Sequence, residues 1–315
     1  MKITVLDANT LGNDIDVSRI SSIGDLTVYP FTEKDEVAER IKDSDVVVLN
    51  KIKLNKENLS CAKKLKLICV TATGYDNIDI EYCRKHGIQV SNIVGYSTNS
   101  VAQVTVATVL ELATHIRDYN QYVTSGNYSA SGVANKVAPT FYELSGKTWG
   151  IIGLGNIGKK VAAIAEAFGC KVLAFKQTPD KNYNCTDLDT LCKNSDIISI
   201  HTPLTEKTKG LIGKRELDMM KPTVIFYNAA RGAVTDEAAV SDAILDKKIG
   251  AFGCDVYSVE PFPIEHPMNR IASLPNVCLT PHMAWASYEA RNLCIDEVIE
   301  NIAAFKNGKK RNSVT

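Results

Sequence analysis

Short apolar runs alternate with amphipathic stretches over the first hundred residues of the chain. Four runs rich in Val and Ile, each bounded by turn residues, predict β-strands at Ile3–Leu6, Asp45–Asn50, Leu65–Val70 and Ile88–Ile93. Between them, apolar side chains recur at helical spacing in Glu33–Lys42 and Ile78–Lys85. Strands that alternate with helices predict a parallel sheet covered by helices on both faces.

The same alternation returns in the second half of the chain. Further strands are predicted at Thr148–Ile152, Lys171–Phe175, Asp196–Ile200, Thr223–Tyr227, Ala251–Val256 and Val277–Leu279. A long helix at Asn99–Thr124, apolar on more than one face, precedes this series, and an amphipathic helix at Ser287–Lys306 follows it. No repeat or low-complexity linker separates the two series. We therefore expect two α/β domains packed across a ligand-binding cleft.

The composition is that of a globular protein. Of the 315 residues, 45% are hydrophobic and 23% are charged, which argues against a disordered or fibrous chain. The 36 basic and 36 acidic side chains balance, whereas a general nucleic-acid or membrane-surface binder needs an excess of positive charge. We expect no signal peptide and no membrane span, because the first apolar run is short and no window approaches about 18 apolar residues.

The nine cysteines are scattered, and none of them forms a C-x-x-C pair. An odd count without zinc-type spacing predicts reduced, mostly buried thiols, with a structural disulfide or a metal site as the alternative. We therefore expect a cytoplasmic protein without a bound metal.

A glycine motif, G-x-G-x-x-G, lies between a predicted strand and a predicted helix, with its glycines at Gly153, Gly155 and Gly158. Dinucleotide binding requires that context. The first glycine allows a tight turn, the second lets the backbone approach a pyrophosphate, and the third permits close packing of helix on strand. The N–H groups of Asn156 and Ile157 would face the phosphates at the positive end of the helix. The alternative is a strand–turn–helix unit without a ligand.

The residue that would select the cofactor is a lysine. An acidic residue about 20 positions after the glycines commonly binds the adenosine ribose diol. Here Lys176 stands near that place, after the second strand of the series. A cation there can pair with a 2′-phosphate, which favours NADP(H). The alternative is a solvated lysine in a pocket that uses NAD(H), and the sequence leaves both open.

Three charged residues follow predicted strands in apolar, glycine-punctuated surroundings: Arg231, Glu260 and His282. Strands of a doubly wound sheet end at one edge, so these side chains can converge there. An Arg fork binds a carboxylate and polarises an adjacent carbonyl. A His donates a proton to the alkoxide formed in a reduction, and a neighbouring Glu fixes its tautomer and favours its protonated form. Singly, each residue is more simply a surface or structural one.

The chain resembles the D-isomer-specific 2-hydroxyacid dehydrogenase family over its whole length. Four ordered motifs carry the resemblance: Gly153–Gly158, Asn228–Gly232, Asp255–Pro261 and Thr280–Trp285. Three further stretches are similar to the glycerate dehydrogenase/hydroxypyruvate reductase branch: Ala72–Asn77, Gly95–Thr98 with Val101–Gln103, and His282 followed by Ala284–Trp285.

The resemblance implies a flavodoxin-like substrate domain, residues 1–98 plus 287–315, and a Rossmann cofactor domain, residues 99–286. It implies that Arg231, Glu260 and His282 are the catalytic set, and that Arg231 and the segment Ala72, Thr73, Gly74 bind the substrate carboxylate. The implied cofactor contacts, besides the glycine motif and Lys176, are Thr105, Thr202, Pro203, Ala229, Ala230 and Asp255. It also implies a homodimer whose interface includes the helix at 99–124 and the neighbouring loop.

These observations predict an enzyme that reduces a small 2-keto acid, with hydroxypyruvate or glyoxylate as the first choice, to the D-(R)-2-hydroxy acid. The hydride donor is NADH or NADPH, and no nucleic acid or membrane partner is expected. One alternative is a dehydrogenase for pyruvate, phenylpyruvate or a branched-chain keto acid. Another is a dinucleotide-sensing binding protein. The other histidines are interpreted as structural or surface residues: His86, His115, His201 and His266.

Overall fold

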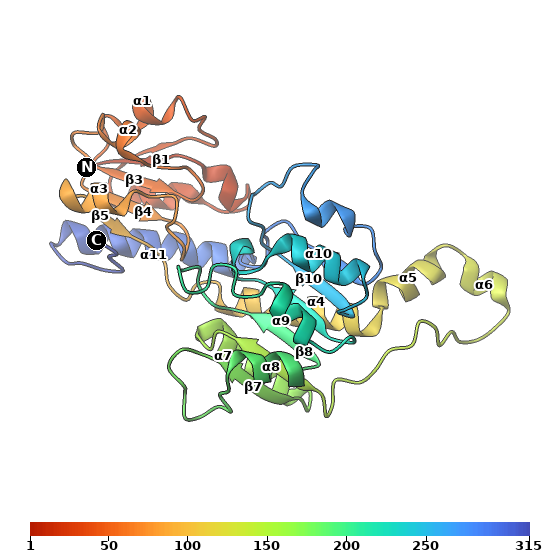
Figure 1. Cartoon of the computed structure of the whole chain (residues 1–315). Helices are drawn as coiled ribbons and strands as arrows, with labels where there is room; N and C mark the ends of the chain where they lie inside the picture. Colours follow the sequence, from red (N-terminus) through yellow and green to blue (C-terminus); the bar gives the residue numbers. More distant parts are fainter. The chain divides into compact units, whose positions relative to one another are not determined.

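Each series of strands forms its own parallel sheet. The computed structural model describes residues 1–315, and the chain divides into two units. Unit 1 comprises Met1–Ser97 and Ala286–Thr315, and unit 2 comprises Thr98–Trp285. Figure 1 shows the elements of both units in sequence colours.

Unit 1 has a five-stranded sheet in the order β2-β1-β3-β4-β5, with every neighbouring pair parallel. Its strands are β1 (Lys2–Val5), β2 (Asp25–Val28), β3 (Val46–Leu49), β4 (Leu67–Val70) and β5 (Gln89–Ser91). Its helices are η1 (Ala8–Leu11), η2 (Val17–Ile23), α1 (Val37–Ile41), α2 (Lys56–Leu59), α3 (Ile80–Lys85) and α11 (Tyr288–Lys306). The central strands β3 and β4 are wholly buried, because helices cover both faces of such a sheet.

Unit 2 has a six-stranded parallel sheet in the order β11-β10-β9-β8-β6-β7. Its strands are β6 (Thr148–Ile152), β7 (Lys171–Phe175), β8 (Ile197–Ile200), β9 (Ile225–Asn228), β10 (Ala251–Cys254) and β11 (Val277–Leu279). Its α-helices are α4 (Thr98–Thr114), α5 (Ile116–Thr124), α6 (Asn127–Ser131), α7 (Asn156–Ala167), α8 (Leu188–Asn194), α9 (Lys214–Met219) and α10 (Glu237–Leu245). Two 3-10 turns complete it, η3 (Gly232–Val234) and η4 (Pro267–Arg270).

Two apolar cores lie on opposite faces of the sheet of unit 2. Ile198 and Ile200 of β8 pack with side chains of α8, α9 and α10. Their neighbour Ile197 belongs to a second cluster, which contains side chains of α4 and α7. Successive residues of a strand point to opposite faces, so this strand is buried on both sides. The predicted doubly wound α/β fold is therefore confirmed.

The longest predicted helix is wrong in extent, and the helix predicted at Glu33–Lys42 is shorter, since α1 spans only Val37–Ile41. The helix expected at Asn99–Thr124 is two helices, α4 and α5, which meet at His115. His115 has a left-handed backbone conformation with φ of 53°, and such a residue ends a right-handed helix. Burial changes at the same point, since Leu112 is the last buried residue of α4 and α5 has none.

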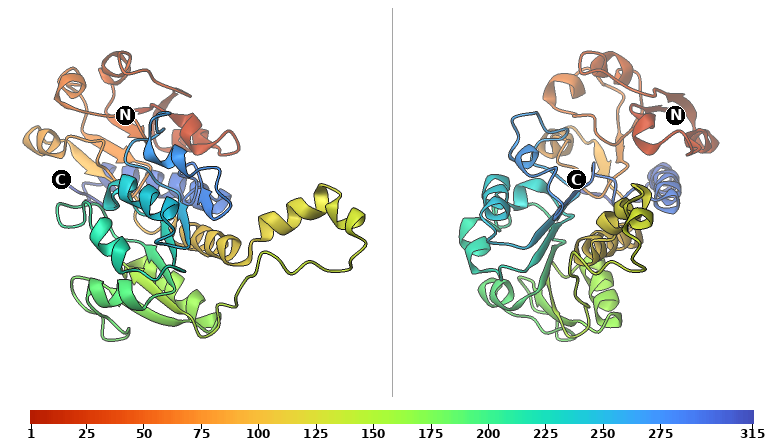
Figure 2. Two further views of the ribbon diagram at one scale, coloured as in Figure 1. Left: turned by 45° about the vertical axis from the view of Figure 1, so that its right-hand side comes forward. Right: turned by 90° about the vertical axis from the view of Figure 1, so that its right-hand side faces the viewer.

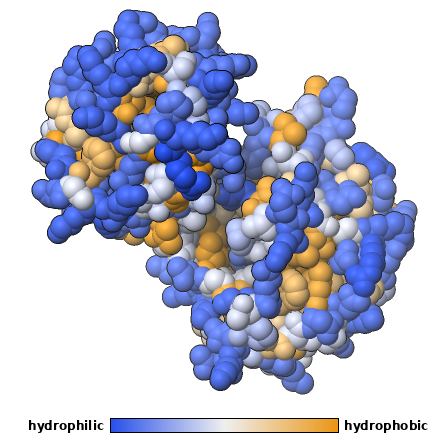
Figure 3. Space-filling view, turned by 60° about the vertical axis from the view of Figure 1, so that its left-hand side comes forward, coloured by the Kyte–Doolittle hydropathy of each residue, from blue (hydrophilic) through white to orange (hydrophobic).

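Hydrophilic residues cover most of the face shown in Figure 3, and hydrophobic residues appear there in smaller groups. No helix combines the length and the apolar character that crossing a bilayer requires. The nine cysteines are all free thiols.

Candidate active site

The three predicted catalytic residues follow three adjacent strands of unit 2. Arg231 comes after β9, Glu260 after β10 and His282 after β11. These strands are neighbours in the sheet and run parallel, so their carboxyl ends share one edge. Ligands of open α/β sheets bind at that edge.

His282 and Glu260 form a direct pair. The imidazole Nδ1 of His282 lies 2.6 Å from Oε2 of Glu260, and the two side chains are 24% and 30% exposed. Oε1 of the same carboxylate accepts a hydrogen bond of 2.8 Å from the backbone N–H of Tyr257. Because a carboxylate accepts hydrogen bonds, the Nδ1 of His282 carries the proton that faces it. Nε2 is then the nitrogen that exchanges protons with a ligand.

The turn that carries His282 is held by a buried carboxylate. His282 has a left-handed backbone, with φ of 54°, a conformation that costs free energy for a residue other than glycine. Asp255 accepts hydrogen bonds from the hydroxyl of Thr280 at 2.6 Å and from the backbone N–H groups of Met283 and Ala284, both at 2.9 Å. Burial raises the pKa of Asp255. The three donors that surround its carboxylate fix the strained turn.

The loop that carries Arg231 touches the loop that carries Glu260. A side-chain carbon added at Gly232 would lie 2.0 Å from the carbonyl carbon of Tyr257, so only glycine allows this approach. The guanidinium of Arg231 donates to the carbonyl of Ala230 at 2.8 Å, and the side chain of Asn228 donates to the carbonyl of Arg231 at 3.0 Å. The structure therefore brings the loops of Arg231, Glu260 and His282 to one edge.

The glycine motif forms a cradle of the shape that a pyrophosphate requires. Gly153 has φ of +98°, and a Cβ there would lie 2.6 Å from the backbone nitrogen of Thr202. A Cβ at Gly158 would lie 2.2 Å from the carbonyl oxygen of Gly153, whereas a Cβ at Gly155 would meet nothing within 4 Å. Helix α7 begins at Asn156 directly after this open position. The space beside Gly155 and the free N–H groups of the helix start fit a dinucleotide.

The remaining predicted cofactor residues of unit 2 are mostly at strand ends. Thr202 and Pro203 follow β8, Ala229 and Ala230 follow β9, and exposed Lys176 follows β7. Thr105 differs, because it is fully buried in α4 and its hydroxyl donates to the carbonyl of Val101 at 2.7 Å. Its contact with a cofactor remains a prediction.

Two ionisable side chains near these strand ends, Lys159 and His201, have local partners. Lys159 of α7 pairs with Asp180 at 2.7 Å, and this pairing holds the pKa of the Asp180 carboxyl below its usual range. Burial lowers the pKa of His201 to about 3, so this imidazole is neutral at physiological pH. Its Nε2 lies 3.0 Å from the hydroxyl of Ser199, which agrees with a structural role.

The predicted carboxylate-binding segment, Ala72–Gly74, lies in unit 1 after β4. The hydroxyl of Thr73 donates to the carbonyl of Ile93 at 2.8 Å, and the side chain of Asn92 donates to the carbonyl of Thr73 at 2.7 Å. These bonds fix the segment, and the backbone N–H groups of Thr73 and Gly74 donate to no group of the chain. They are available to an anion.

Comparison with known proteins agrees with this geometry. Residues 106–284 match the D-isomer specific 2-hydroxyacid dehydrogenase, NAD binding domain. The chain belongs to this family. It is therefore an oxidoreductase, an NAD(P)-dependent D-2-hydroxyacid dehydrogenase, and the family and cofactor class predicted from the motifs are confirmed. The matched residues lie in unit 2.

Relatives from the predicted branch cover nearly all of the chain. A glycerate dehydrogenase from Methylorubrum extorquens is 39% identical over 89% of this chain and 88% of its own length. A hydroxypyruvate reductase from Blautia hydrogenotrophica is 36% identical over 100% of this chain and 99% of its own. A solved structure of an acyclic imino acid reductase in complex with NADPH and D-Arg has a TM-score of 0.87 at 30% identity, and each chain is covered in full.

The sequence did not reveal every residue that shapes the site. Asp255 was expected to contact the cofactor, but its anchoring of the His282 turn was not foreseen. Glu237 was not singled out, and His266 was interpreted only as structural or surface. Both residues are only 8% exposed in the structure, but their neighbours in the chain are largely exposed, so no sequence pattern marks them.

Proposed function

We propose that the protein reduces hydroxypyruvate or glyoxylate to the D-(R)-2-hydroxy acid. The observation that carries this proposal is the 2.6 Å pair of His282 and Glu260 at the sheet edge beside the Arg231 loop. An acid/base imidazole, a guanidinium and a dinucleotide cradle in one unit are the groups that this reduction needs. The names of the relatives, glycerate dehydrogenase and hydroxypyruvate reductase, support the choice of substrate.

Each catalytic residue has a distinct role in this proposal. The bound nicotinamide cofactor supplies the hydride for the carbonyl carbon. Arg231 binds the substrate carboxylate and polarises the carbonyl. His282 donates the proton from Nε2 to the oxygen as it gains negative charge, and takes it back in the reverse direction. Glu260 holds Nδ1–H and stabilises the imidazolium by charge attraction.

Unit 1 is the proposed substrate domain, and unit 2 is the proposed cofactor domain. We propose that the backbone N–H groups of Thr73 and Gly74 bind the substrate carboxylate, because they have no partner in the chain. The proposed cofactor contacts are Gly153, Gly155, Asn156, Ile157, Gly158, Lys176, Thr202, Pro203, Ala229, Ala230, Asp255 and Thr105. Lys176 is the residue proposed to decide between NADPH and NADH.

The decisive experiment is the His282→Ala variant. We expect its turnover on hydroxypyruvate and glyoxylate to fall about 10²- to 10⁴-fold, because that is the usual contribution of general acid catalysis. Cofactor affinity, measured by fluorescence titration, stays near the wild-type value. His86→Ala removes an exposed histidine of unit 1 and serves as the control. Near-normal turnover of His282→Ala would contradict the role of His282 as the acid/base residue. A kinetic panel of about ten keto acids with both reduced cofactors then identifies the preferred substrate.

We further propose a homodimer formed through the segment 116–143, called the arm below. In Figure 1 and in the left view of Figure 2, α5 and α6 of this segment extend away from the sheet of unit 2. Exposed apolar side chains gather on it, among them Val137 and Tyr142 at 79% and 70% exposure. An apolar surface of this kind on one segment supports a protein partner.

We also propose that the protein works in the cytoplasm, and its nine free thiols support a reducing compartment.

A further inference from the structure

A carboxylate–imidazole pair, Glu237 and His266, is buried beneath the loop that carries Glu260. Glu237 is the first residue of α10, and His266 directly precedes η4. Each residue is only 8% exposed. Burying such groups is costly unless they are paired and hydrogen-bonded, so their partners indicate what the pair does.

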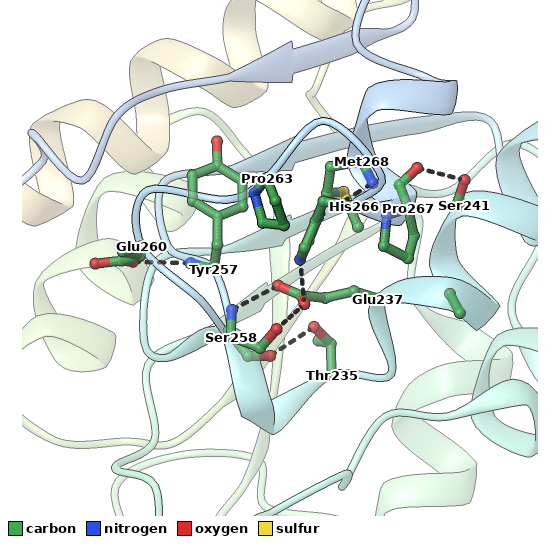
Figure 4. A network of polar contacts seen from close by, with 12 residues as sticks. Thr235, Glu237, Ser241, Tyr257, Ser258, Glu260, Pro263, His266, Pro267 and Met268 are labelled. Carbon is green, nitrogen blue, oxygen red and sulfur yellow. Dashed lines mark hydrogen bonds and ion pairs between the residues drawn. The ribbon is translucent and has the colours of Figure 1, made fainter.

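Glu237 is bonded to three donors, two of which belong to one residue of the Glu260 loop. Its Oε1 accepts from the backbone N–H of Ser258 at 2.9 Å. Its Oε2 accepts from the hydroxyl of Ser258 and lies 3.0 Å from Nε2 of His266. Figure 4 shows the carboxylate beneath this loop, with Ser258 and His266 directed toward it. The carboxylate thus fixes both the peptide and the side chain at position 258.

The hydrogen bonds of His266 determine its tautomer. Nδ1 accepts from the backbone N–H of Met268 at 3.3 Å, so this nitrogen carries no proton. Nε2 therefore carries the proton and donates it to Glu237. With this tautomer, the backbone N–H of Met268 and the Nε2–H of His266 both have acceptors. The hydrogen bonds therefore run in one order, from Met268 to His266 to Glu237.

The same loop is held at a second point, near the ring of His266. Phe262 stacks on His266 with ring centroids 4.9 Å apart, and Tyr257 meets Phe262 edge-on at 4.6 Å. The hydroxyl of Tyr257 donates to the carbonyl of Thr280, two residues before His282, at 2.9 Å. The backbone N–H of Tyr257 donates to Oε1 of Glu260. The loop is thus fixed on both sides of Glu260.

We infer that Glu237 and His266 are positioning residues for the reaction. They hold the segment 257–262 so that Oε2 of Glu260 faces His282. The inference rests on the proposed roles of Glu260 and His282. Apolar packing of similar volume often stabilises a fold as well as a buried polar pair does, so stability does not explain this pair. Its contacts do, because the Glu237 carboxylate accepts two hydrogen bonds from Ser258 and so fixes the position of the loop.

The test is the Glu237→Gln variant, which keeps the size of the side chain. A glutamine amide has only one oxygen, so it cannot accept from all three donors. Its NH2 group must face either the backbone N–H of Ser258 or the Nε2–H of His266. We expect kcat to fall about 10- to 100-fold, because a misplacement of about 1 Å in a site has effects of this size. KM changes less than about threefold. The pH above which keto-acid reduction declines moves lower, because a displaced carboxylate no longer stabilises the imidazolium that donates the proton.

Ser241→Ala is the matched control. Ser241 lies in the same helix, is fully buried and donates to the carbonyl of Pro267 at 3.0 Å, in the segment that follows His266. This variant loses a comparable buried hydrogen bond without touching the Glu260 loop, so kcat and the pH profile stay at wild-type values. Ser258→Ala removes only the hydroxyl donor and shifts both readouts in the direction of Glu237→Gln by a smaller amount. It replaces Glu237→Gln if thermal unfolding shows that the latter does not fold.

A double-variant cycle separates this inference from the proposed function. If Glu237 acts through Glu260, adding Glu237→Gln to Glu260→Gln lowers kcat by less than about twofold further, since residues in one network are not additive. Equal losses in both backgrounds, or an unchanged pH profile in Glu237→Gln when Glu260→Gln shifts it, would overturn the positioning role alone. Normal turnover of His282→Ala would instead remove the proposed function itself.

Discussion

His282 has a backbone conformation that its own side chain disfavours. The residue is left-handed, with φ of 54°, and a glycine would adopt this conformation at lower cost. Asp255 compensates, because its carboxylate binds the hydroxyl and N–H groups on both sides of the histidine. Strain of this kind persists only where surrounding contacts over-determine it. Here the contacts direct an imidazole at the edge of the sheet.

Lys176 provides the test of cofactor preference. If its ammonium pairs with a 2′-phosphate, Lys176→Asp lowers the ratio of kcat/KM with NADPH to kcat/KM with NADH about 10- to 100-fold, which corresponds to about 1.5–3 kcal/mol for a hydrogen bond to a charged group. Lys171→Asp makes the same charge change at the opposite end of β7 and leaves the ratio unchanged. Steady-state kinetics with both cofactors measure it. An equal ratio in Lys176→Asp and wild type would mean that the lysine is merely solvated.

The proposed catalytic residues were accessible to sequence reasoning because each follows a strand. Arg231, Glu260 and His282 stand after β9, β10 and β11, and parallel topology brings such positions together. Glu237 and His266 follow no comparable rule. They lie 29 residues apart, and only the packing of α10 beneath the 257–262 segment makes them partners. Pairing that depends on tertiary packing leaves no periodic trace in a sequence.

Among the elements, every strand except β2 was predicted from the sequence. The bounds of β6, β7 and β11 agree with the prediction, since turn residues flank each apolar run. Strand β2 was not predicted, because it lies at the sheet edge and is largely exposed. The break at His115 was missed for a related reason, since helical spacing continues past the point where burial ends.

Two glycines of the cradle, Gly155 and Gly158, are expected to respond differently to substitution by alanine. Gly155 has an ordinary extended backbone, and a Cβ there meets no atom within 4 Å. Gly155→Ala should therefore change the free energy of unfolding by less than about 0.5 kcal/mol. It should weaken NAD(P)H binding at least about tenfold, since the added methyl occupies the place of the pyrophosphate.

Gly158→Ala is expected to lower the stability of the fold, unlike Gly155→Ala. Its Cβ would lie 2.2 Å from a backbone oxygen, so α7 must move away from the strand, and we expect a loss of about 1–3 kcal/mol in stability. Chemical denaturation and fluorescence titration measure the two effects. Unaltered cofactor affinity in Gly155→Ala would contradict the assignment of the cradle.

At the scale of the whole molecule, the exposed apolar side chains of the arm are not covered by any other part of unit 2. Residues 120–143 are almost all exposed, although large apolar side chains occur along them. Segments of this kind without a covering element mark protein interfaces. The two sheets, in contrast, bury their apolar faces within their own units. A second copy of the chain is the partner that family resemblance implies.

The dimer can be tested by charging the arm. Wild-type protein should sediment at twice the mass of one chain, and the double variant Val137→Asp/Tyr142→Asp should sediment at the mass of one, because buried carboxylates without partners disfavour an apolar interface. Phe31→Asp is the control, since Phe31 is 58% exposed and lies in unit 1, away from the arm sequence. It should keep the dimer mass. A wild-type chain that sediments as a monomer at micromolar concentration, or a charged arm that still dimerises, would contradict an interface at this segment.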